Sequence, residues 1–419
     1  LKTKSDTEVL LELYIKLGPS MLNKLNGMFS LLILNKETFE LFIARDRLGI
    51  KPLYYTNYKG FMTVSSEIAP LISLYGFSKP DEIGIRQYLK LRAFFNGRTY
   101  LQKINMFPAG YYMLNNKFIR YWQLPKGRQK NPAEEELVEL LKSSVQYRCI
   151  SDVEVGSYLS GGVDSTLITA LARKIDSWTV GFSSMNEFDW GRLGAQYIGT
   201  NHREVLVNEE EFLQIAESII KKRKEPLSVP NEILLYKMTQ EVKTKNTAIL
   251  SGEGADELFF GYDRIFNWAR NNNWDLDSFD SHYSYGSHKD NEILEDVLAP
   301  FMDYGNPIDV VAAFFQIAHL HGLLRRLDNA TMLCSVEARV PFVDHRLVER
   351  MAGVSYDYRV QNKISKYPLK TIFQKYLPKE IINRKKVGFP VPLSNIFSDK
   401  KPLMDQWLRF NLDTLGIKQ

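Results

Sequence analysis

The segment Ser160-Gly161-Gly162-Val163-Asp164-Ser165-Thr166 decides the fold class of this chain. It stands between the apolar run 153–159, which predicts a strand, and the run 167–174, which predicts a helix. Two adjacent glycines let backbone N–H groups approach an anion, and the following helix directs its positive end to the same point. A lone Gly-Gly pair would indicate only a tight turn. With its hydroxyl donors and this context, the segment predicts a phosphate site.

The phosphate site is not one of the two commonest kinds. The chain has neither the GxxxxGK(S/T) pattern of a Walker loop nor the GxGxxG pattern of a dinucleotide site. The segment resembles the pyrophosphate loop of ATP pyrophosphatases, which cleave ATP between its α and β phosphates. That resemblance implies ATP as a cosubstrate.

A second glycine turn carries acidic side chains. Ser251-Gly252-Glu253-Gly254-Ala255-Asp256-Glu257 follows the predicted strand 247–250. Carboxylates beside a phosphate site would repel the ligand unless a hard cation such as Mg²⁺ lay between them. An acidic helix N-terminus is the alternative explanation. Two glycine turns at the carboxyl ends of strands in one sheet favour the ligand site, because α/β sheets bind ligands at that edge.

The chain predicts two domains and a linker. Short β-rich runs at 28–34, 41–44, 53–56 and 61–65 and a hairpin over 111–122 are too close in sequence for parallel crossovers, so residues 1–122 predict antiparallel sheet. Residues 123–132 are polar, contain two prolines and predict the linker. Alternating β and α segments in 133–419 predict a doubly wound parallel sheet, helical beyond Tyr262. The polar segment 271–291 predicts a surface loop.

Bulk properties exclude several classes of function. The net charge is +5, and the basic run at 221–224 is typical of a solvated helix end rather than of a nucleic-acid surface. Cys149 and Cys334 are the only cysteines and form no CxxC pair, which argues against a disulfide framework or a zinc site. No apolar run approaches about 18 residues and no signal peptide is visible. We therefore expect a cytoplasmic protein without a nucleic-acid or membrane partner.

Several blocks together resemble the glutamine-hydrolysing asparagine synthetase family. The synthetase-type blocks are 159–166, 251–262, 335–347 (SVEARVPFVDHRL) and 386–390 (KVGFP), and the glutaminase-type blocks are 25–29 (LNGMF) and 44–55 (ARDRLGIKPLYY). They occur in the family's order over nearly the whole chain. The resemblance implies an antiparallel β sandwich of the N-terminal-nucleophile glutaminase (class II amidotransferase) type, partial here, followed by an ATP-pyrophosphatase domain. The resemblance is also compatible with a homodimer.

The resemblance also implies roles for individual residues. The loop 160–166 would hold the β and γ phosphates, with Asp164 and Asp256 near Mg²⁺. The remaining ATP-binding positions would be Leu159 and Gly252 against the adenosine, Val180 in the adjacent strand, and Ser251 and Glu253 of the second turn. Glu337 would accept the proton of the incoming amine, although a salt bridge to Arg339 is an alternative role for it. Lys386, supported by Lys366, would steady charge on the departing pyrophosphate, which explains the basic run 384–386 better than a solvated surface does.

The implied reaction is ATP-dependent amidation of a carboxylate, L-aspartate to L-asparagine in the first instance. An acyl-adenylate forms, AMP and pyrophosphate are released, and nitrogen comes from glutamine or ammonia. The family's nucleophilic Cys and most of its glutamine-binding residues would lie upstream of Leu1, so we expect a truncated glutaminase in which Asp6 alone matches a residue that holds the glutamine amino group. We expect this chain to use ammonia, and its end at Gln419 falls short of the family's usual C-terminus.

Departures from the family pattern keep other substrates open. Lys224, Val229 and Asn231 replace residues usual in asparagine synthetases, Asp189-Trp190 replaces an Asp-Glu pair, and Phe260 replaces a glycine. They resemble homologues that amidate sugar acids or other carboxylates in surface-polysaccharide or secondary-metabolite biosynthesis. Less favoured alternatives are a β-lactam-type cyclase, for which we identify no partner tyrosine, an RNA-modifying pyrophosphatase, and a non-catalytic assembly subunit.

Overall fold

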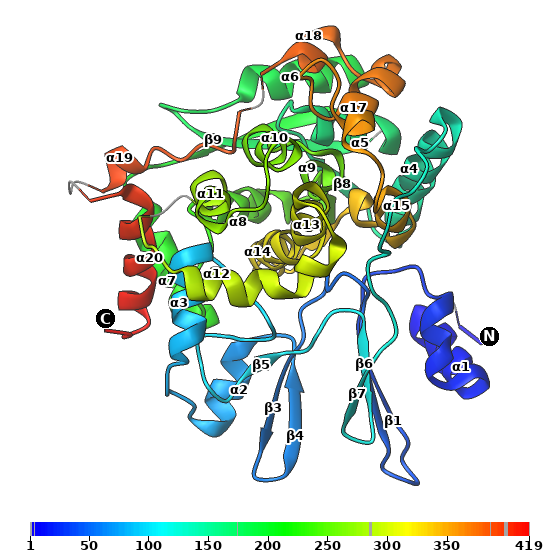
Figure 1. Ribbon diagram of the computed structural model, residues 1–419, viewed down its shortest axis with the longest axis vertical. Helices are drawn as coiled ribbons and strands as arrows, with labels where there is room; N and C mark the ends of the chain where they lie inside the picture. The colour runs from blue at the N-terminus through cyan, green and yellow to red at the C-terminus, as the bar shows by residue number, and fades with distance from the viewer. Residues whose placement is uncertain are drawn as a thin grey trace.

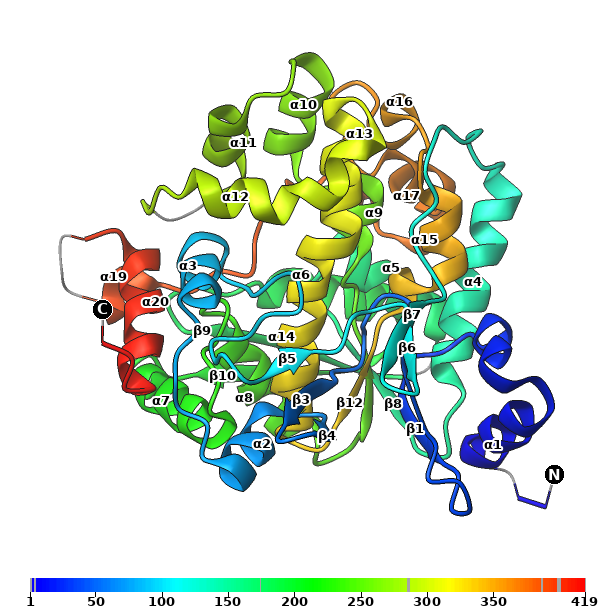
Figure 2. The ribbon, with the colours of Figure 1, turned by 60° about the horizontal axis from the view of Figure 1, so that its bottom comes forward.

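The computed structural model describes residues 2–3, 5–173, 175–284, 287–385, 387–397 and 401–418. Two antiparallel sheets lie at the bottom of Figure 1, and a parallel sheet wrapped by helices fills the upper part. The chain ends lie on opposite sides of the molecule in both ribbon views (Figures 1 and 2). The two halves expected from the sequence are therefore visible as different architectures.

The N-terminal half begins with helix α1 (Asp6–Leu17), whose N-cap Ser5 accepts a hydrogen bond from the Thr7 backbone N–H. The antiparallel pairing predicted here is confirmed, but it forms two sheets, ordered β1-β2-β6-β7 and β4-β3-β5. The elements after α1 are η1 (Gly18–Lys24), β1 (Ser30–Leu34), β2 (Leu41–Arg45), β3 (Tyr54–Tyr58), β4 (Phe61–Ser65), α2 (Ile68–Tyr75), α3 (Glu82–Leu91), β5 (Asn105–Met106), β6 (Tyr111–Leu114) and β7 (Lys117–Arg120).

The second half contains a five-stranded sheet with the order β10-β9-β8-β11-β12, and every neighbouring pair is parallel. The doubly wound parallel sheet is thus confirmed. Its strands are β8 (Val155–Tyr158), β9 (Asp176–Phe182), β10 (Asn201–Val207), β11 (Ala248–Leu250) and β12 (Glu337–Arg339). The helices between them are α4 (Glu134–Cys149), α5 (Val163–Ala172), α6 (Phe188–Ile198), α7 (Phe212–Arg223) and α8 (Glu232–Val242). Because the strand order reverses at β8, the crevice between β8 and β11 is the topological switch point, where such sheets bind ligands.

The remaining chain is mainly helical, as expected. It differs from the prediction in two places, an additional strand and a helix inside a segment predicted to be a loop. The additional strand is β12, which adds to the sheet edge after a long helical excursion. The segment is 271–291, which is not a loop throughout: α11 (Leu276–Tyr283) forms within it, and its N-cap Asp275 accepts from the Ser278 N–H. The other elements are α9 (Ala255–Phe259), α10 (Asp263–Asn271), α12 (Asn291–Leu298), η2 (Ala299–Tyr304), α13 (Pro307–Phe314), η3 (Phe315–His319), α14 (Leu320–Met332), η4 (Pro341–Val343), α15 (His345–Met351), α16 (Tyr356–Arg359), α17 (Tyr367–Ile372), η5 (Gln374–Tyr376), α18 (Lys379–Asn383), α19 (Leu393–Ile396) and α20 (Leu403–Thr414).

The continuous helical stretch from α13 through α14 is long and apolar enough, by length and composition, to cross a membrane, contrary to the sequence expectation. Half of its apolar window is buried inside the protein. The stretch contacts α8, α10 and β12, so its apolar face packs within the fold.

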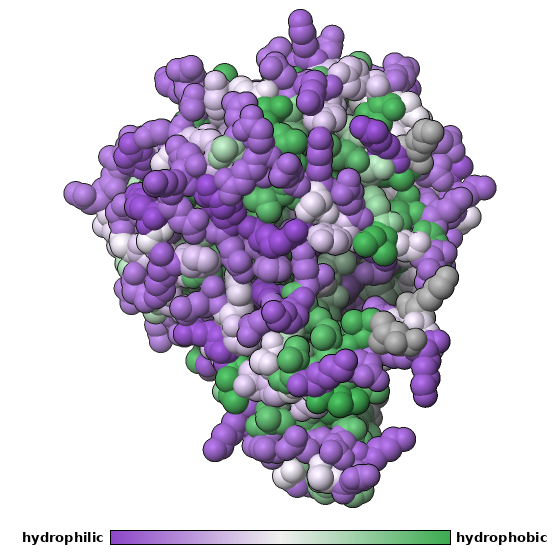
Figure 3. Space-filling view, turned by 90° about the vertical axis from the view of Figure 1, so that its right-hand side faces the viewer, coloured by the Kyte–Doolittle hydropathy of each residue, from purple (hydrophilic) through white to green (hydrophobic). Residues whose placement is uncertain are grey.

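Apolar burial differs between the halves. One large hydrophobic cluster spans the parallel sheet, its helices and part of the N-terminal half, whereas the β1-β2 sheet packs a small cluster around Phe42. Figure 3 shows apolar surface gathered over the N-terminal sheets, and Leu32, Leu34 and Ile119 are exposed there. The parallel sheet is therefore the better-packed platform, and it carries the candidate site.

Candidate active site

The two glycine turns meet at the switch point. The first follows β8 and the second follows β11, and these neighbouring strands pair with Leu250 opposite Ser157. A Cβ built on Gly252 would lie 3.0 Å from the Ser165 amide nitrogen and 3.1 Å from Asp164 Cβ. The turns are thus in direct contact, as their positions in the sequence predicted.

Glycine is required at one point of the first turn. Gly161 has φ 71°, and a Cβ there would lie 2.3 Å from the backbone of Trp190 in α6. The turn is braced from inside, because the Ser160 N–H donates to Ser165 Oγ over 3.2 Å and the two hydroxyls lie 3.1 Å apart. Gly162 caps α5, which places the loop at the positive end of that helix. This local geometry suits an anion.

A buried lysine joins the two turns. Lys366 Nζ lies 2.5 Å from Asp164 Oδ2 and 2.6 Å from Asp256 Oδ1. Burial lowers the pKa of Lys366, but Asp164 and Asp256 raise it further, so the net shift is upward and the ammonium stays charged. Gly261 makes room for the cluster, since a Cβ there would collide with both Asp256 Oδ1 and the Lys366 side chain.

Two further carboxylates flank this cluster. Glu253 is partly exposed and forms an ion pair with Arg326 of α14, which also donates to Asn231 over 3.2 Å. Glu257 is buried, and burial together with the neighbouring Asp256 raises its pKa to about 8. Glu257 accepts a hydrogen bond of 2.6 Å from the Tyr262 hydroxyl. Glu253 is therefore held at the surface of the site by Arg326, whereas Glu257 is held in the core by Tyr262.

The residues present fit a magnesium ion. Mg²⁺ in nucleotide sites commonly uses one or two carboxylates together with phosphate oxygens and water. Asp164 and Asp256 converge within hydrogen-bond distance of one point, the Lys366 ammonium. Among the described residues no group of three or more His, Cys, Asp or Glu side chains forms a metal cage. The cluster suits a metal that arrives with a phosphate ligand rather than one permanently caged by protein.

The basic run at 384–386 contributes to the first turn. Arg384 donates to the Gly161 carbonyl over 3.1 Å, pairs with Glu187, and stacks 4.5 Å from the Trp190 ring. Its side chain is 9% exposed, so it is a buried contact that fixes the loop and not a solvated cation. Lys386 lies outside the described residues.

Comparison with known proteins identifies the family. Residues 136–414 match the Asparagine synthase family, and residues 1–122 match the Glutamine amidotransferase domain. The chain belongs to the asparagine synthase family. It is 28% identical to glutamine-hydrolyzing asparagine synthetase 1 of Bacillus subtilis over 97% of this chain and 74% of that protein. It is 25% identical to the glutamine-hydrolyzing asparagine synthetase of Cricetulus griseus over 98% of this chain and 72% of that protein.

An archaeal relative gives the same result. The chain is 30% identical to putative glutamine-hydrolyzing asparagine synthetase 2 of Methanocaldococcus jannaschii over 64% of this chain and 56% of that protein. The resemblance expected from the sequence is thus confirmed, and the chain is an enzyme of this carbon–nitrogen ligase family.

Other predicted residues of the asparagine synthase site lie in different places. Leu159 is fully buried directly before the first turn, and Val180 is buried in β9, the strand on the other side of β8 from β11. Ser165 and Thr166 are buried in the first turn of α5, and Ser251 is buried at the end of β11. Asp6 is exposed in the first turn of α1, in the N-terminal half.

Glu337 is not brought to the phosphate loop. It begins β12 and pairs with Ala248, which in turn pairs with Val155 at the start of β8. At about 3.3 Å per residue, the loop after β8 begins about 16 Å further along the sheet. Glu337 instead lies 3.2 Å from Arg339, whose guanidinium also donates to the Arg148 and Ile150 carbonyls. This is the geometry of the alternative salt bridge.

Proposed function

We propose that this asparagine synthase family member converts a carboxylate into an amide at the expense of ATP, with L-aspartate as the first substrate to test. The carrying observation is the junction of two glycine turns at the switch point, cross-linked by Lys366 through Asp164 and Asp256. The first turn supplies backbone N–H groups and a helix N-terminus for phosphates. The second supplies carboxylates at the same edge.

The proposed reaction has two steps. A substrate carboxylate oxygen attacks the α-phosphorus of ATP, the bond from that phosphorus to the bridging oxygen breaks, and pyrophosphate leaves. Ammonia, supplied directly or released from glutamine, then attacks the acyl carbon and AMP leaves. Adenylation is needed because an oxide ion cannot leave a carboxylate, whereas AMP can. The protein's contribution is placement and the neutralisation of phosphate charge.

The charged groups have separate proposed roles. Asp164 and Asp256 would hold Mg²⁺, which when bound supplies positive charge between the carboxylates and the phosphate oxygens. Lys366 keeps these carboxylates together, and Arg384 fixes the loop through the Gly161 carbonyl. Lys386 stays a proposal from the family resemblance, as a cation for the departing pyrophosphate.

The proton acceptor is better assigned to Glu253 than to Glu337. Ammonia must lose a proton after it attacks the acyl carbon, so the base must lie at the edge that holds the adenylate. Glu253 directly follows Gly252, which abuts the phosphate loop, whereas Glu337 begins its strand at the other edge. Arg326 orients the Glu253 carboxylate from α14.

A different carboxylate is the second candidate. The Asn231 side chain, one of the departures from the family pattern, accepts from the same Arg326 that orients Glu253. A change at this position therefore stands next to the reacting groups, where it can alter which substrate carboxylate fits. Sugar acids are the class that the family resemblance suggests.

One experiment tests the proposed reaction and distinguishes the two candidate classes of substrate. The chain is incubated with ATP, Mg²⁺ and ammonium, and AMP and pyrophosphate are measured for L-aspartate, uronic acids and other carboxylates. We expect AMP and pyrophosphate in equal amounts with at least one of these. ADP and phosphate as products would overturn the proposed chemistry, and a preference for a uronic acid over aspartate would move the substrate to the second class.

A further inference from the structure

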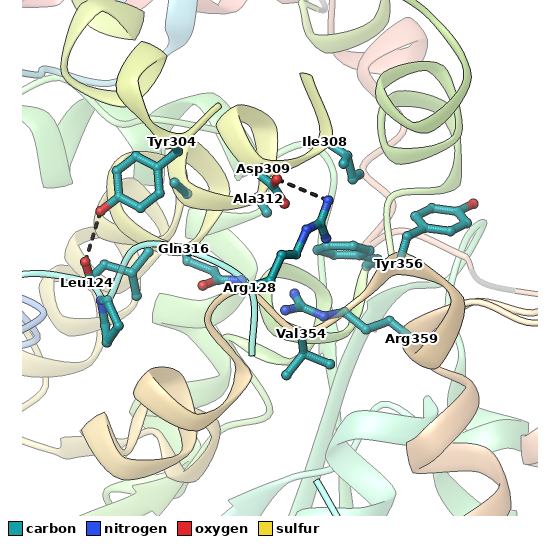
Figure 4. Close-up of a pocket in the computed structure, with 15 residues that line it drawn as sticks. Leu124, Arg128, Tyr304, Ile308, Asp309, Ala312, Gln316, Val354, Tyr356 and Arg359 are labelled. Carbon is teal, nitrogen blue, oxygen red and sulfur yellow. Dashed lines mark hydrogen bonds and ion pairs between the residues drawn. The ribbon is translucent and has the colours of Figure 1, made fainter. Parts of the chain in front are cut away.

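A second pocket lies away from the ATP-type turns. It is enclosed by the segment after β7 around Leu124–Arg128, by α13 and η3, and by the segment 353–359 (Figure 4). Its volume, including the part open to solvent, is about 450 Å³. None of the residues proposed above for ATP or for catalysis lines it. The pocket therefore needs its own explanation.

The most unusual lining residue is Arg359. Its side chain is fully buried, and it donates to two main-chain carbonyls, those of Leu258 and Met351. In the part of the chain that the structure describes, no carboxylate lies within ion-pair distance of Arg359, and its Nε has no hydrogen-bond partner. Burial lowers the pKa of Arg359 to about 9. The Asp309 carboxylate opposes this shift from beyond ion-pair distance and is shared with Arg128, so a further anion beside Arg359 would be stabilising.

A second unsatisfied donor lines the same pocket. Gln316 is 1% exposed, and its Nε2 has no partner among the described residues. It belongs to η3, a single π-helical turn between α13 and α14, and such turns often occur at functional sites. Buried polar groups are almost always hydrogen-bonded, so two unmet donors in one pocket indicate a ligand acceptor.

The charge and shape of the lining define the ligand. Arg128 reaches over the pocket and pairs with Asp309 over 3.1 Å, with the Gln316 and Arg359 side chains beside it (Figure 4). The guanidinium groups of Arg128 and Arg359 and the carboxylate of Asp309 together give the pocket one net positive charge. Planar N–H donors of this kind match the two oxygens of a carboxylate. The other walls are apolar, among them Phe260, Ile308 and Val354.

We propose that this pocket binds a small carboxylate with a short apolar body, its oxygens on the side of the pocket that the Arg359 and Gln316 side chains line. The pocket shares no residue with the site proposed for amidation. It lies against α9, since Arg359 donates to Leu258 of that helix and stacks 4.2 Å from the ring of Phe260, its C-cap. An occupant would therefore stiffen the helix that carries Asp256.

The test is calorimetric titration of the whole chain with sodium acetate, sodium isobutyrate and sodium phosphate at constant ionic strength, without ATP. We expect saturable binding of both carboxylates, with isobutyrate tighter by about 4-fold for each methylene-sized group that it buries. Tighter binding of phosphate than of isobutyrate would overturn the ligand class. No saturable binding of any probe would mean that the donors face water alone, and the proposal would fall.

Variants locate the binding. Gln316→Leu keeps the size and removes the donor, so we expect about 10-fold weaker isobutyrate binding. Arg128→Gln, at a half-exposed side chain, should also weaken it several-fold. Lys126→Gln removes the same charge two residues away, outside the lining, and should leave binding unchanged. Lys366→Met should leave it unchanged as well, and loss of binding there would place the probe in the ATP crevice instead.

Discussion

At the scale of single residues, we expect substitutions of Glu253 and Glu337 to have different effects on catalysis. Glu253→Gln should still allow adenylate formation and slow the capture of ammonia by about 10²–10⁴-fold, the usual value of a positioned base. Glu337→Gln should leave both steps within a few-fold of wild type, because Glu337 pairs with Arg339. The measurements are ATP–pyrophosphate exchange without ammonia and amide formation with it. If Glu337→Gln slows the capture of ammonia and Glu253→Gln does not, the proton acceptor is Glu337.

Lys366 should act on the earlier step. Lys366→Met leaves Asp164 and Asp256 facing each other without the cation that now lies 2.5 and 2.6 Å from them. We expect exchange to fall by about 10²-fold or more, since charge stabilisation at the reacting phosphates is lost. Excess Mg²⁺ should restore part of the rate, because a divalent cation can take over the neutralisation. Lys375→Met, a change of another lysine that lies outside the cluster, is the control and should leave exchange intact.

Residue roles were predictable where they follow from local chemistry. Asp164 and Asp256 stand inside short motifs next to glycine turns, so their convergence at one sheet edge could be inferred. Arg326 and Arg384 could not be assigned, because each reaches its partner from more than 70 residues away in sequence. Lys366 was named only as support, and its place between the two aspartates depends on the packing of α17 on α9.

At the scale of elements, the turn from β8 into α5 should be intolerant of a methyl group. Gly161→Ala adds a Cβ that would meet the Trp190 backbone, at a φ of 71° that alanine disfavours by about 1–2 kcal/mol. We expect loss of ATP–pyrophosphate exchange with a modest fall in melting temperature. Gly60→Ala, at a positive φ with open space around it, carries the same backbone penalty without the clash. If Gly161→Ala retains full exchange, the turn does not hold the phosphates.

The packing of the edge strand β10 on β9 should contribute less to the free energy of unfolding in mild acid. His202 lies 2.9 Å from Ser177 Oγ and 3.2 Å from Thr179 Oγ1 of β9, and burial, with Arg192 nearby, lowers its pKa from 6.5 to about 4. The unfolded chain therefore binds the proton first, so this contribution to stability is present above pH 6.5 and is lost as pH falls toward 4. Since the ring is partly exposed, we expect about 1–2 kcal/mol.

His202→Gln removes this titration and keeps hydrogen-bonding capacity. Urea unfolding at pH 7 and pH 5 should show a larger loss of stability in wild type than in the variant. Equal losses would show that other groups account for the acid sensitivity.

Elements were predictable where a period or a turn signal is strong. The strands around both glycine turns and helix α1 follow from apolar patterning and caps. Strand β12 was missed because three residues, Glu-Ala-Arg, carry no alternating pattern, and it forms only because β11 offers a free edge. Helix α11 was missed because its polar sequence looks like a loop, while Phe279 and Tyr283 bury themselves against Phe314.

At the scale of the whole molecule, one helix connects the two halves with the site. Three side chains of α14 reach other parts of the protein: His321 contacts Arg45, Arg326 pairs with Glu253, and Asp328 pairs with Lys51. The motif 44–55, which the sequence marked as glutaminase-like, therefore touches the helix that orients Glu253. No local pattern predicts this arrangement, because it follows from how the N-terminal sheets dock on the parallel-sheet domain. The order of domains was predictable, but their contact was not.

The ion pair between Lys51 and Asp328 tests whether this contact holds the halves together. Lys51 Nζ lies 2.9 Å from Asp328 Oδ1, with side chains 18% and 8% exposed, so water screens the pair only partly. Lys51→Met leaves Asp328 without its cation, whereas the double change to Met and Asn removes both charges. A double-mutant cycle on urea unfolding should therefore give a coupling of about 1–3 kcal/mol. The exposed pair of Lys221 and Glu217 within α7 should give about 0.5 kcal/mol or less. If both cycles give the same small coupling, this ion pair does not hold the halves together, and Lys51→Met should then also leave amide formation unaffected.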